Sequence, residues 1–155
     1  MTDPVDKRVY VDSNVLIYAV EGVPATAGPA KELIKFLRSW HGLMFASEIA
    51  IAEVQAPSKE KAAWPLHAKR RVYLDLLVFS AVNLVPVTRD ILIRTADLRK
   101  ITPLKLPDAI HVETAVQSKC RFLVTGDAAF KKLPAGLQLV KPDEEGIRDL
   151  LRELS

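Results

Sequence analysis

The sequence predicts an α/β fold, a three-layer sandwich with helices on both faces of a parallel sheet of about five strands. Short β-branched runs alternate with longer segments of helical periodicity along the 155 residues. Strands joined by helices run parallel, with right-handed crossovers. The strand runs are apolar throughout, as expected for a sheet covered on both faces. This length and 49% hydrophobic residues suit one core, so we expect a single domain over residues 1–155.

The first half of the chain provides two strands and several helices. Residues 8–11 (RVYV) have high strand propensity and are followed by Asp12, which predicts the first strand, and a helix follows over 15–20. After a turn around Gly22 and Pro24, the helical spacing of apolar residues predicts a helix over 30–40. The elements expected next are a strand at 43–46, a helix at 48–55 with Ser47 as its cap and Pro57 as its stop, and a helical region at 58–82 interrupted at Pro65.

The second half repeats the alternation. Residues 84–87 predict a strand, and Pro86 within it indicates an edge position. A proline in a first helical turn marks the start of a helix at 107–119. The other expected elements are a helix at 89–100, strands at 121–124 and 137–140, and a closing helix at 143–154.

Composition sets limits on function. The 22 Lys and Arg against 19 Asp and Glu give a net charge of +3, which permits a nucleic-acid partner without requiring one. Cys120 is the only cysteine, so a disulfide framework and a cysteine-rich zinc site are excluded. The N-terminal residues lack the basic and apolar regions of a signal peptide, and no apolar run is long enough to span a bilayer. We expect a soluble cytoplasmic protein with no membrane association.

Four acidic residues lie in apolar or turn contexts. Asp12 and Asp127 each follow a predicted strand, Asp108 opens a helix, and Glu53 lies in an apolar helical segment. Each has a simpler explanation when taken alone: a helix cap, a charge that complements the helix dipole, or a solvated helix residue. In an open parallel sheet, however, ligands bind beyond the carboxyl ends of the strands where strand order reverses. Asp12 and Asp127 would face each other there if their strands are neighbours.

Several carboxylates in one crevice repel one another unless a cation compensates them. Mg²⁺ or Mn²⁺ is the natural cation, because both prefer oxygen ligands. The three histidines are scattered and no zinc-ligand spacing occurs. A carboxylate-bound ion of this kind activates water and stabilises charge on a phosphate, which suits hydrolysis of phosphodiester bonds.

Four segments, in this order, resemble the motifs of PIN-domain nucleases. They are residues 9–18 (VYVDSNVLIY), 47–54 (SEIAIAEV), 106–115 (LPDAIHVETA) and 123–130 (LVTGDAAF). Each motif alone is weak, whereas four in the family's order and spacing, over roughly residues 8–140, are specific. In length and in the residues of its motifs the chain is most similar to the VapC-type toxins of bacterial and archaeal toxin–antitoxin pairs.

The resemblance implies strand order 3-2-1-4-5 and a metal-dependent endoribonuclease. Its acidic pocket would consist of Asp12, Glu53, Asp108 and Asp127. The three aspartates would bind Mg²⁺ or Mn²⁺, and Glu53 would bind the ion or orient the attacking water. The resemblance also implies an RNA substrate, a homodimer, and inhibition by a small antitoxin protein.

Other polar residues have two interpretations. Asn14 and Thr125 could hydrogen-bond the carboxylates, or could be a turn residue and a strand-end residue. For His111 we expect a helix residue with a satisfied imidazole rather than a substrate contact or proton carrier, and for Glu113 a solvated side chain.

Further segments concern the substrate and the dimer. We expect solvated surface rather than RNA contacts for the basic clusters at 69–71, 99–100 and 131–132. The apolar run at 73–79 would be buried all round or would meet a second subunit.

The rival functions are weaker. A phosphatase with an aspartate nucleophile needs a second acid where Asn14 stands, a phospho-acceptor domain needs an acceptor aspartate after the third strand, and no P-loop motif occurs. The remaining alternative is a non-catalytic PIN-like scaffold that binds RNA or protein.

Overall fold

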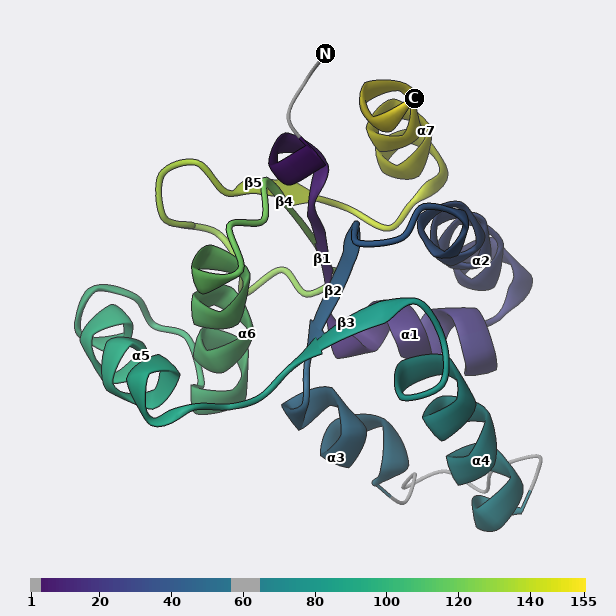
Figure 1. Ribbon diagram of the computed structural model, residues 1–155, viewed down its shortest axis with the longest axis horizontal. Coiled ribbons are helices and arrows are strands. Elements are labelled where there is room, and N and C mark those ends of the chain that lie inside the picture. The colour runs from purple at the N-terminus through teal and green to yellow at the C-terminus, as the bar shows by residue number, and fades with distance from the viewer. Residues whose placement is uncertain (1–3, 57–64) are drawn as a thin grey trace.

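The computed structural model describes residues 4–56 and 65–155, and it shows a five-stranded sheet with helices on both faces (Figure 1). The strand order is β3-β2-β1-β4-β5 and every neighbouring pair is parallel, which confirms the predicted class and order. In chain order, the elements are η1 (Pro4–Lys7), β1 (Val9–Val11), α1 (Ser13–Glu21), α2 (Pro24–Ser39), β2 (Met44–Ser47), α3 (Ile49–Gln55), α4 (Leu66–Leu77), β3 (Val82–Val85), α5 (Arg89–Ile101), α6 (Leu106–Gln117), β4 (Phe122–Val124), β5 (Gln138–Val140) and α7 (Glu144–Leu154).

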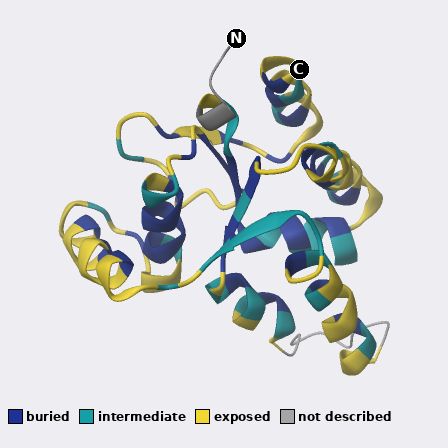
Figure 2. Ribbon diagram, in the orientation of Figure 1, coloured by how far each residue is buried: buried dark blue, intermediate teal, exposed yellow. Residues whose placement is uncertain are grey.

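The central strand β1 separates two hydrophobic cores. Val9 and Val11 pack on the face covered by α1, α2 and α7, whereas Tyr10 points into the opposite core with α6. This follows from the alternation of side chains along a strand. Figure 2 shows β1 and most of α6 buried, and the outer face of α5 exposed. Tyr10 is therefore an interior residue on the same side of the strand as Asp12.

The pairing of β1 with β4 places the carboxyl ends of the two strands together. Val11 pairs with Val124 in the parallel register, and the Asp12 N–H donates to the Val124 carbonyl at 3.0 Å. Chain order reverses here, because β2 lies on one side of β1 and β4 on the other. Asp12 and Thr125 thus emerge side by side at the topological switch point of the sheet, where open α/β folds bind their ligands.

Three boundaries differ from those predicted. The helix expected over 30–40 is α2 and begins at Pro24, because Pro24 occupies the first helical turn, where its missing N–H costs nothing. The helical region expected to reach residue 82 ends at Leu77, and Val82 already starts β3, an edge strand as predicted. The part of that region at 58–64 lies outside the described residues.

The start of α3 also differs in detail. Ser47 is the last residue of β2 and Glu48 occupies the cap position, although the Ser47 hydroxyl still accepts a hydrogen bond from the Ile49 N–H at 3.2 Å. In the part of the chain that the structure describes, no helix is both long and apolar enough to cross a membrane.

Candidate active site

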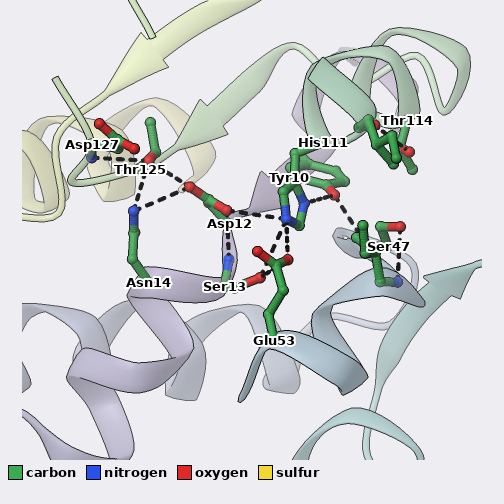
Figure 3. Close-up of polar contacts among 12 residues, drawn as sticks. Tyr10, Asp12, Ser13, Asn14, Ser47, Glu53, His111, Thr114, Thr125 and Asp127 are labelled. Atoms are coloured by element: carbon green, nitrogen blue, oxygen red, sulfur yellow. Dashed lines mark hydrogen bonds and ion pairs between the residues drawn. The ribbon is translucent and has the colours of Figure 1, made fainter. Parts of the chain in front are cut away.

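Asp12 is the centre of the polar cluster at the switch point (Figure 3). It is 5% exposed and is the N-cap of α1. Its Oδ1 accepts the Ser13 N–H at 2.7 Å, and its Oδ2 accepts from Asn14 Nδ2 at 3.1 Å and from Thr125 Oγ1 at 2.7 Å. Burial raises the pKa of Asp12 above its ordinary value, against the opposing effects of His111, Thr125 and Ser13. Asp12 is thus both the helix cap that the simpler explanation predicts and the central residue of the candidate site.

Asn14 and Thr125 connect Asp12 to the loop after β4. Asn14 Nδ2 also donates to Thr125 Oγ1 at 3.0 Å, and Asn14 Oδ1 accepts the Gly126 N–H at 3.1 Å. The Thr125 hydroxyl oxygen accepts the Asp127 N–H at 3.1 Å. Of the two interpretations of Asn14 and Thr125, the structure shows the hydrogen bonds to a carboxylate. They fix the loop that carries Asp127 relative to Asp12.

His111 joins three elements around Glu53. It is fully buried on α6, its Nδ1 lies 2.6 Å from the Tyr10 hydroxyl of β1, and its Nε2 lies 2.5 Å from Glu53 Oε1 of α3. The same Nε2 is 3.5 Å from Asp12 Oδ1. Ser13 Oγ donates to Glu53 Oε1 at 2.8 Å. His111 is satisfied, as expected, but its partners are the predicted site residues themselves (Figure 3).

The direction of these hydrogen bonds follows from the chemistry of the groups. An ionised carboxylate only accepts, so the proton on Nε2 of His111 lies toward Glu53. When the imidazole is neutral, Nδ1 accepts the Tyr10 hydroxyl proton, and when it is protonated, Nδ1 donates to the Tyr10 oxygen. In both forms the Tyr10 oxygen accepts the Ser47 N–H at 3.1 Å. Both ring nitrogens of His111 and the Tyr10 hydroxyl therefore have partners, which holds Glu53 in one orientation.

The pKa values of the His111–Glu53 pair move in opposite directions. Burial alone would lower the pKa of His111, but the hydrogen bond to Glu53 and the charges of Asp12, Glu53 and Asp108 raise it. Burial alone would raise the pKa of Glu53, but its hydrogen bonds to His111 and Ser13 lower it. Each partner therefore stabilises the charged form of the other.

Asp108 and Asp127 are less buried than Asp12. Asp108 is half-buried in the first turn of α6, and burial followed by the charges of Asp12 and Asp127 raises its pKa. Asp127 is exposed, and its Oδ1 accepts the Ala129 N–H at 2.9 Å. The charges of Asp12, Asp127 and Glu53 all act on Asp108, so the four predicted acids lie in one region of the structure.

The four acids are not assembled around one point. Within residues 4–56 and 65–155, no three Asp, Glu, His or Cys side chains are placed to share a metal ion. In this arrangement the carboxylates of Asp12, Glu53 and Asp127 each accept a hydrogen bond from the protein instead.

The donor set nevertheless suits a hard divalent cation. The cluster offers carboxylate oxygens from four residues, and both ring nitrogens of His111 are already engaged. Burial is the largest cause of the raised pKa of Asp12 and of Asp108, and the charges of neighbouring carboxylates add to it. Oxygen donors with excess negative charge are the ligands that Mg²⁺ and Mn²⁺ take in proteins.

Two polar residues of the cluster, Ser13 and Tyr10, are not evident as site residues from the sequence. Their contacts to His111 span 98 and 101 residues, so no local pattern reveals them. The one available signal is that Tyr10 stands two residues before Asp12 and so shares its side of β1.

Two expectations about charged residues were wrong. Glu113 is 8% exposed rather than solvated, because α6 is enclosed between the sheet and α5. Lys69 is also buried and pairs with Glu21 at 3.1 Å, so it is neither solvated surface nor an RNA contact.

The apolar run at 73–79 is only partly buried. Tyr73 and Leu77 are buried, whereas Phe79 is 78% exposed.

Comparison with known proteins agrees with this geometry. The family profile of the PIN domain matches residues 9–136, and the chain therefore belongs to the PIN domain family. No curated protein sequence matches the chain.

Solved structures add a more specific likeness. A chain of a toxin–antitoxin complex from Klebsiella pneumoniae is 29% identical, with a TM-score of 0.63, over 88% of this chain and 98% of that one. DNA-bound VapBC from Salmonella typhimurium is 18% identical with a TM-score of 0.65, over 87% of this chain and 98% of the other. FitAcB from Neisseria gonorrhoeae is 17% identical with a TM-score of 0.58, over 86% and 97%. The latter two show the fold alone.

Proposed function

We propose that this protein is an Mg²⁺- or Mn²⁺-dependent endoribonuclease that acts as the toxin of a type II toxin–antitoxin pair. The observation that carries the proposal is Asp12, held by three hydrogen bonds at the switch point of the sheet with three further carboxylates around it. Membership of the PIN domain family and the likeness to the Klebsiella pneumoniae complex support it.

The roles of the acids follow from their surroundings. Asp12, Asp108 and Asp127 would hold the ion, and Glu53 would hold it or orient the attacking water. The bound ion would activate water and stabilise charge on the scissile phosphate. Asn14 and Thr125 orient Asp12, since each donates a hydrogen bond to its Oδ2, and the bond from Thr125 favours the ionised form.

His111 would act through Glu53. Its hydrogen bond lowers the pKa of Glu53 and so keeps the carboxylate ionised at neutral pH. Tyr10 holds the imidazole from the other side at 2.6 Å. This chain of contacts fixes the orientation of Glu53, and we assign it a positioning role.

The remaining features of the proposal concern partners and organisation. An RNA substrate, a small antitoxin and a homodimer are proposed from the family resemblance and from the toxin–antitoxin complex that the chain is similar to. Residues 1–155 would form one nuclease domain, acting in the cytoplasm, where RNA is available. The exposed Phe79 at the end of α4 is available to a second subunit.

An RNA cleavage assay tests the function. Purified protein is incubated with total tRNA, ribosomal RNA and mRNA, with Mg²⁺ or Mn²⁺ and with EDTA, beside Asp12→Asn and the surface control Asp90→Asn. We expect cleavage by wild type and by Asp90→Asn only with metal, and none by Asp12→Asn. Equal cleavage by a folded Asp12→Asn would refute the metal site. Tight binding of a partner without any cleavage would favour the non-catalytic scaffold.

A further inference from the structure

A cavity adjoins the acidic cluster on the side of β5. It has a volume of about 640 Å³ and lies between α1, the start of α2, the loop after β4 and the connection from β5 to α7. Its lining includes Thr125, Gly126 and Asp127, which also belong to the cluster around Asp12. We call it the Tyr18 pocket, and its volume is within the range that accommodates small-molecule ligands.

The lining of the Tyr18 pocket combines an aromatic ring with cations. The Tyr18 ring comes from α1, and Lys131 and Lys141 line the pocket from the two connections that border it. Among the described residues, neither lysine takes part in an ion pair. The acids of the pocket are engaged locally: Asp143 Oδ1 accepts the Gly146 N–H at 2.7 Å, and Asp127 Oδ1 accepts that of Ala129.

Gly126 forms the wall between the pocket and the acids. A Cβ at this position would lie 2.7 Å from the Tyr18 hydroxyl oxygen, so only glycine allows the ring to lie against the loop. The Gly126 N–H donates to Asn14 Oδ1, and Asn14 in turn donates to Asp12. A ligand seated against Gly126 is therefore held at a fixed position relative to Asp12.

We propose that the Tyr18 pocket binds one nucleotide of the RNA strand beside the scissile phosphodiester, with its base against Tyr18 and its phosphate between Lys131 and Lys141. The inference rests on the proposed nuclease function and extends it to substrate positioning. Bases stack on aromatic rings and phosphates pair with lysine, and the pocket offers both in one cavity next to the acids. This pocket gives one strand a defined path into the crevice.

Nucleotide binding without metal is the first test. The ¹⁵N-labelled full chain is titrated in EDTA with each ribonucleoside 5′-monophosphate and with inorganic phosphate, and amide shifts are followed. At least one nucleotide should shift Gly126 and Ala128 saturably and bind more tightly than phosphate. Tyr18→Leu should weaken binding at least fivefold, while Tyr18→Phe, which keeps the ring, should not. Equal affinity for phosphate and nucleotides, or no shift in the pocket, would overturn the proposal.

A charge-matched control separates the pocket from general electrostatics. The double variant Lys131→Gln/Lys141→Gln should weaken nucleotide binding roughly fivefold or more. Lys31→Gln/Lys35→Gln removes the same charge from the cavity between α1, α2 and α4 and should leave binding unchanged. An equal loss in both double variants would show that the lysines act only through net charge, and would overturn the assignment.

Cleavage kinetics with Mn²⁺ distinguish failure of the pocket from failure of the nuclease function. If wild type cuts RNA, Lys131→Gln/Lys141→Gln should raise KM at nearly constant kcat, whereas the control pair should not. An unchanged KM refutes the pocket and leaves the nuclease function intact. Nucleotide binding without any RNA cleavage refutes the nuclease function and, with it, the substrate role of the pocket.

Discussion

Replacing Thr125 with valine removes a hydroxyl that three groups of the site use. Thr125 is 2% exposed, and its Oγ1 donates to Asp12 and accepts from Asn14 and from the Asp127 N–H. Valine has nearly the same shape and cannot replace any of these contacts. The change therefore isolates the hydrogen bonds of Thr125 from its packing.

The expected loss of stability is large for the removal of one hydroxyl group. A hydrogen bond to a charged group contributes about 1.5–3 kcal/mol, and a buried group left without a partner costs a similar amount. We expect Thr125→Val to lower the free energy of unfolding by about 3 kcal/mol. For a chain of this length that lowers Tm by about 6–12 °C. Loss of the Thr125 hydrogen bond also raises the pKa of Asp12 further, and we expect roughly 10–100-fold less cleavage.

The chain provides a matched control at Thr95. This residue is fully buried on α5, and among the described residues its hydroxyl has no hydrogen-bond partner. Thr95→Val should leave Tm unchanged or raise it, and should not affect cleavage. Thermal unfolding and RNA cleavage are measured for both variants and for Thr125→Ser, which keeps the hydroxyl. A Thr125→Val protein as stable and active as Thr95→Val would refute the hydrogen-bond network.

Three further predictions concern charge. Asp108→Asn removes a carboxylate whose pKa is raised by burial and by the charges of Asp12 and Asp127, so in EDTA at neutral pH it should raise Tm slightly, because solvent screens this partly buried group; the gain shrinks toward pH 4, and a lower Tm at neutral pH would contradict it. Because the pKa of His111 is raised on folding, its stabilising effect is complete below about pH 6.5 and declines above. The Tm difference between wild type and His111→Gln should therefore shrink from about pH 6 to pH 8, and a constant difference would contradict it. Lys69→Met breaks the buried pair with Glu21 and should cost about 3 kcal/mol in chemical denaturation without affecting cleavage, while the exposed Arg70→Met costs little.

The backbone around the site was predictable because local signals determine it. Apolar β-branched runs ended by Asp12 and by Thr125-Gly126-Asp127 define strand ends, and parallel strands bring such ends to one edge. The positions of Asn14 and Thr125 just after these strands follow from the same argument. The limits of α4 and β3 were not predictable, since the apolar sequence around residues 73–85 is compatible with both helix and strand.

The side-chain partners were predictable only in part. The contact of His111 with Glu53 depends on how α6 and α3 meet beyond the sheet, and 58 residues separate the two. The basic run at residues 69–71 predicts a surface position for Lys69, yet on α4 its side chain pairs with Glu21 at the end of α1. Such pairs arise from tertiary packing, which overrides what local charge patterns indicate.

Mn²⁺ titration by calorimetry tests the central claim, that these carboxylates form a site for a divalent cation, without knowledge of the RNA target. Wild type and Asp90→Asn should bind Mn²⁺, and Asp12→Asn should bind it at least tenfold more weakly, since Asp12 is the fixed centre of the cluster. Equal Mn²⁺ affinity in a folded Asp12→Asn, or no binding by wild type, would contradict the account.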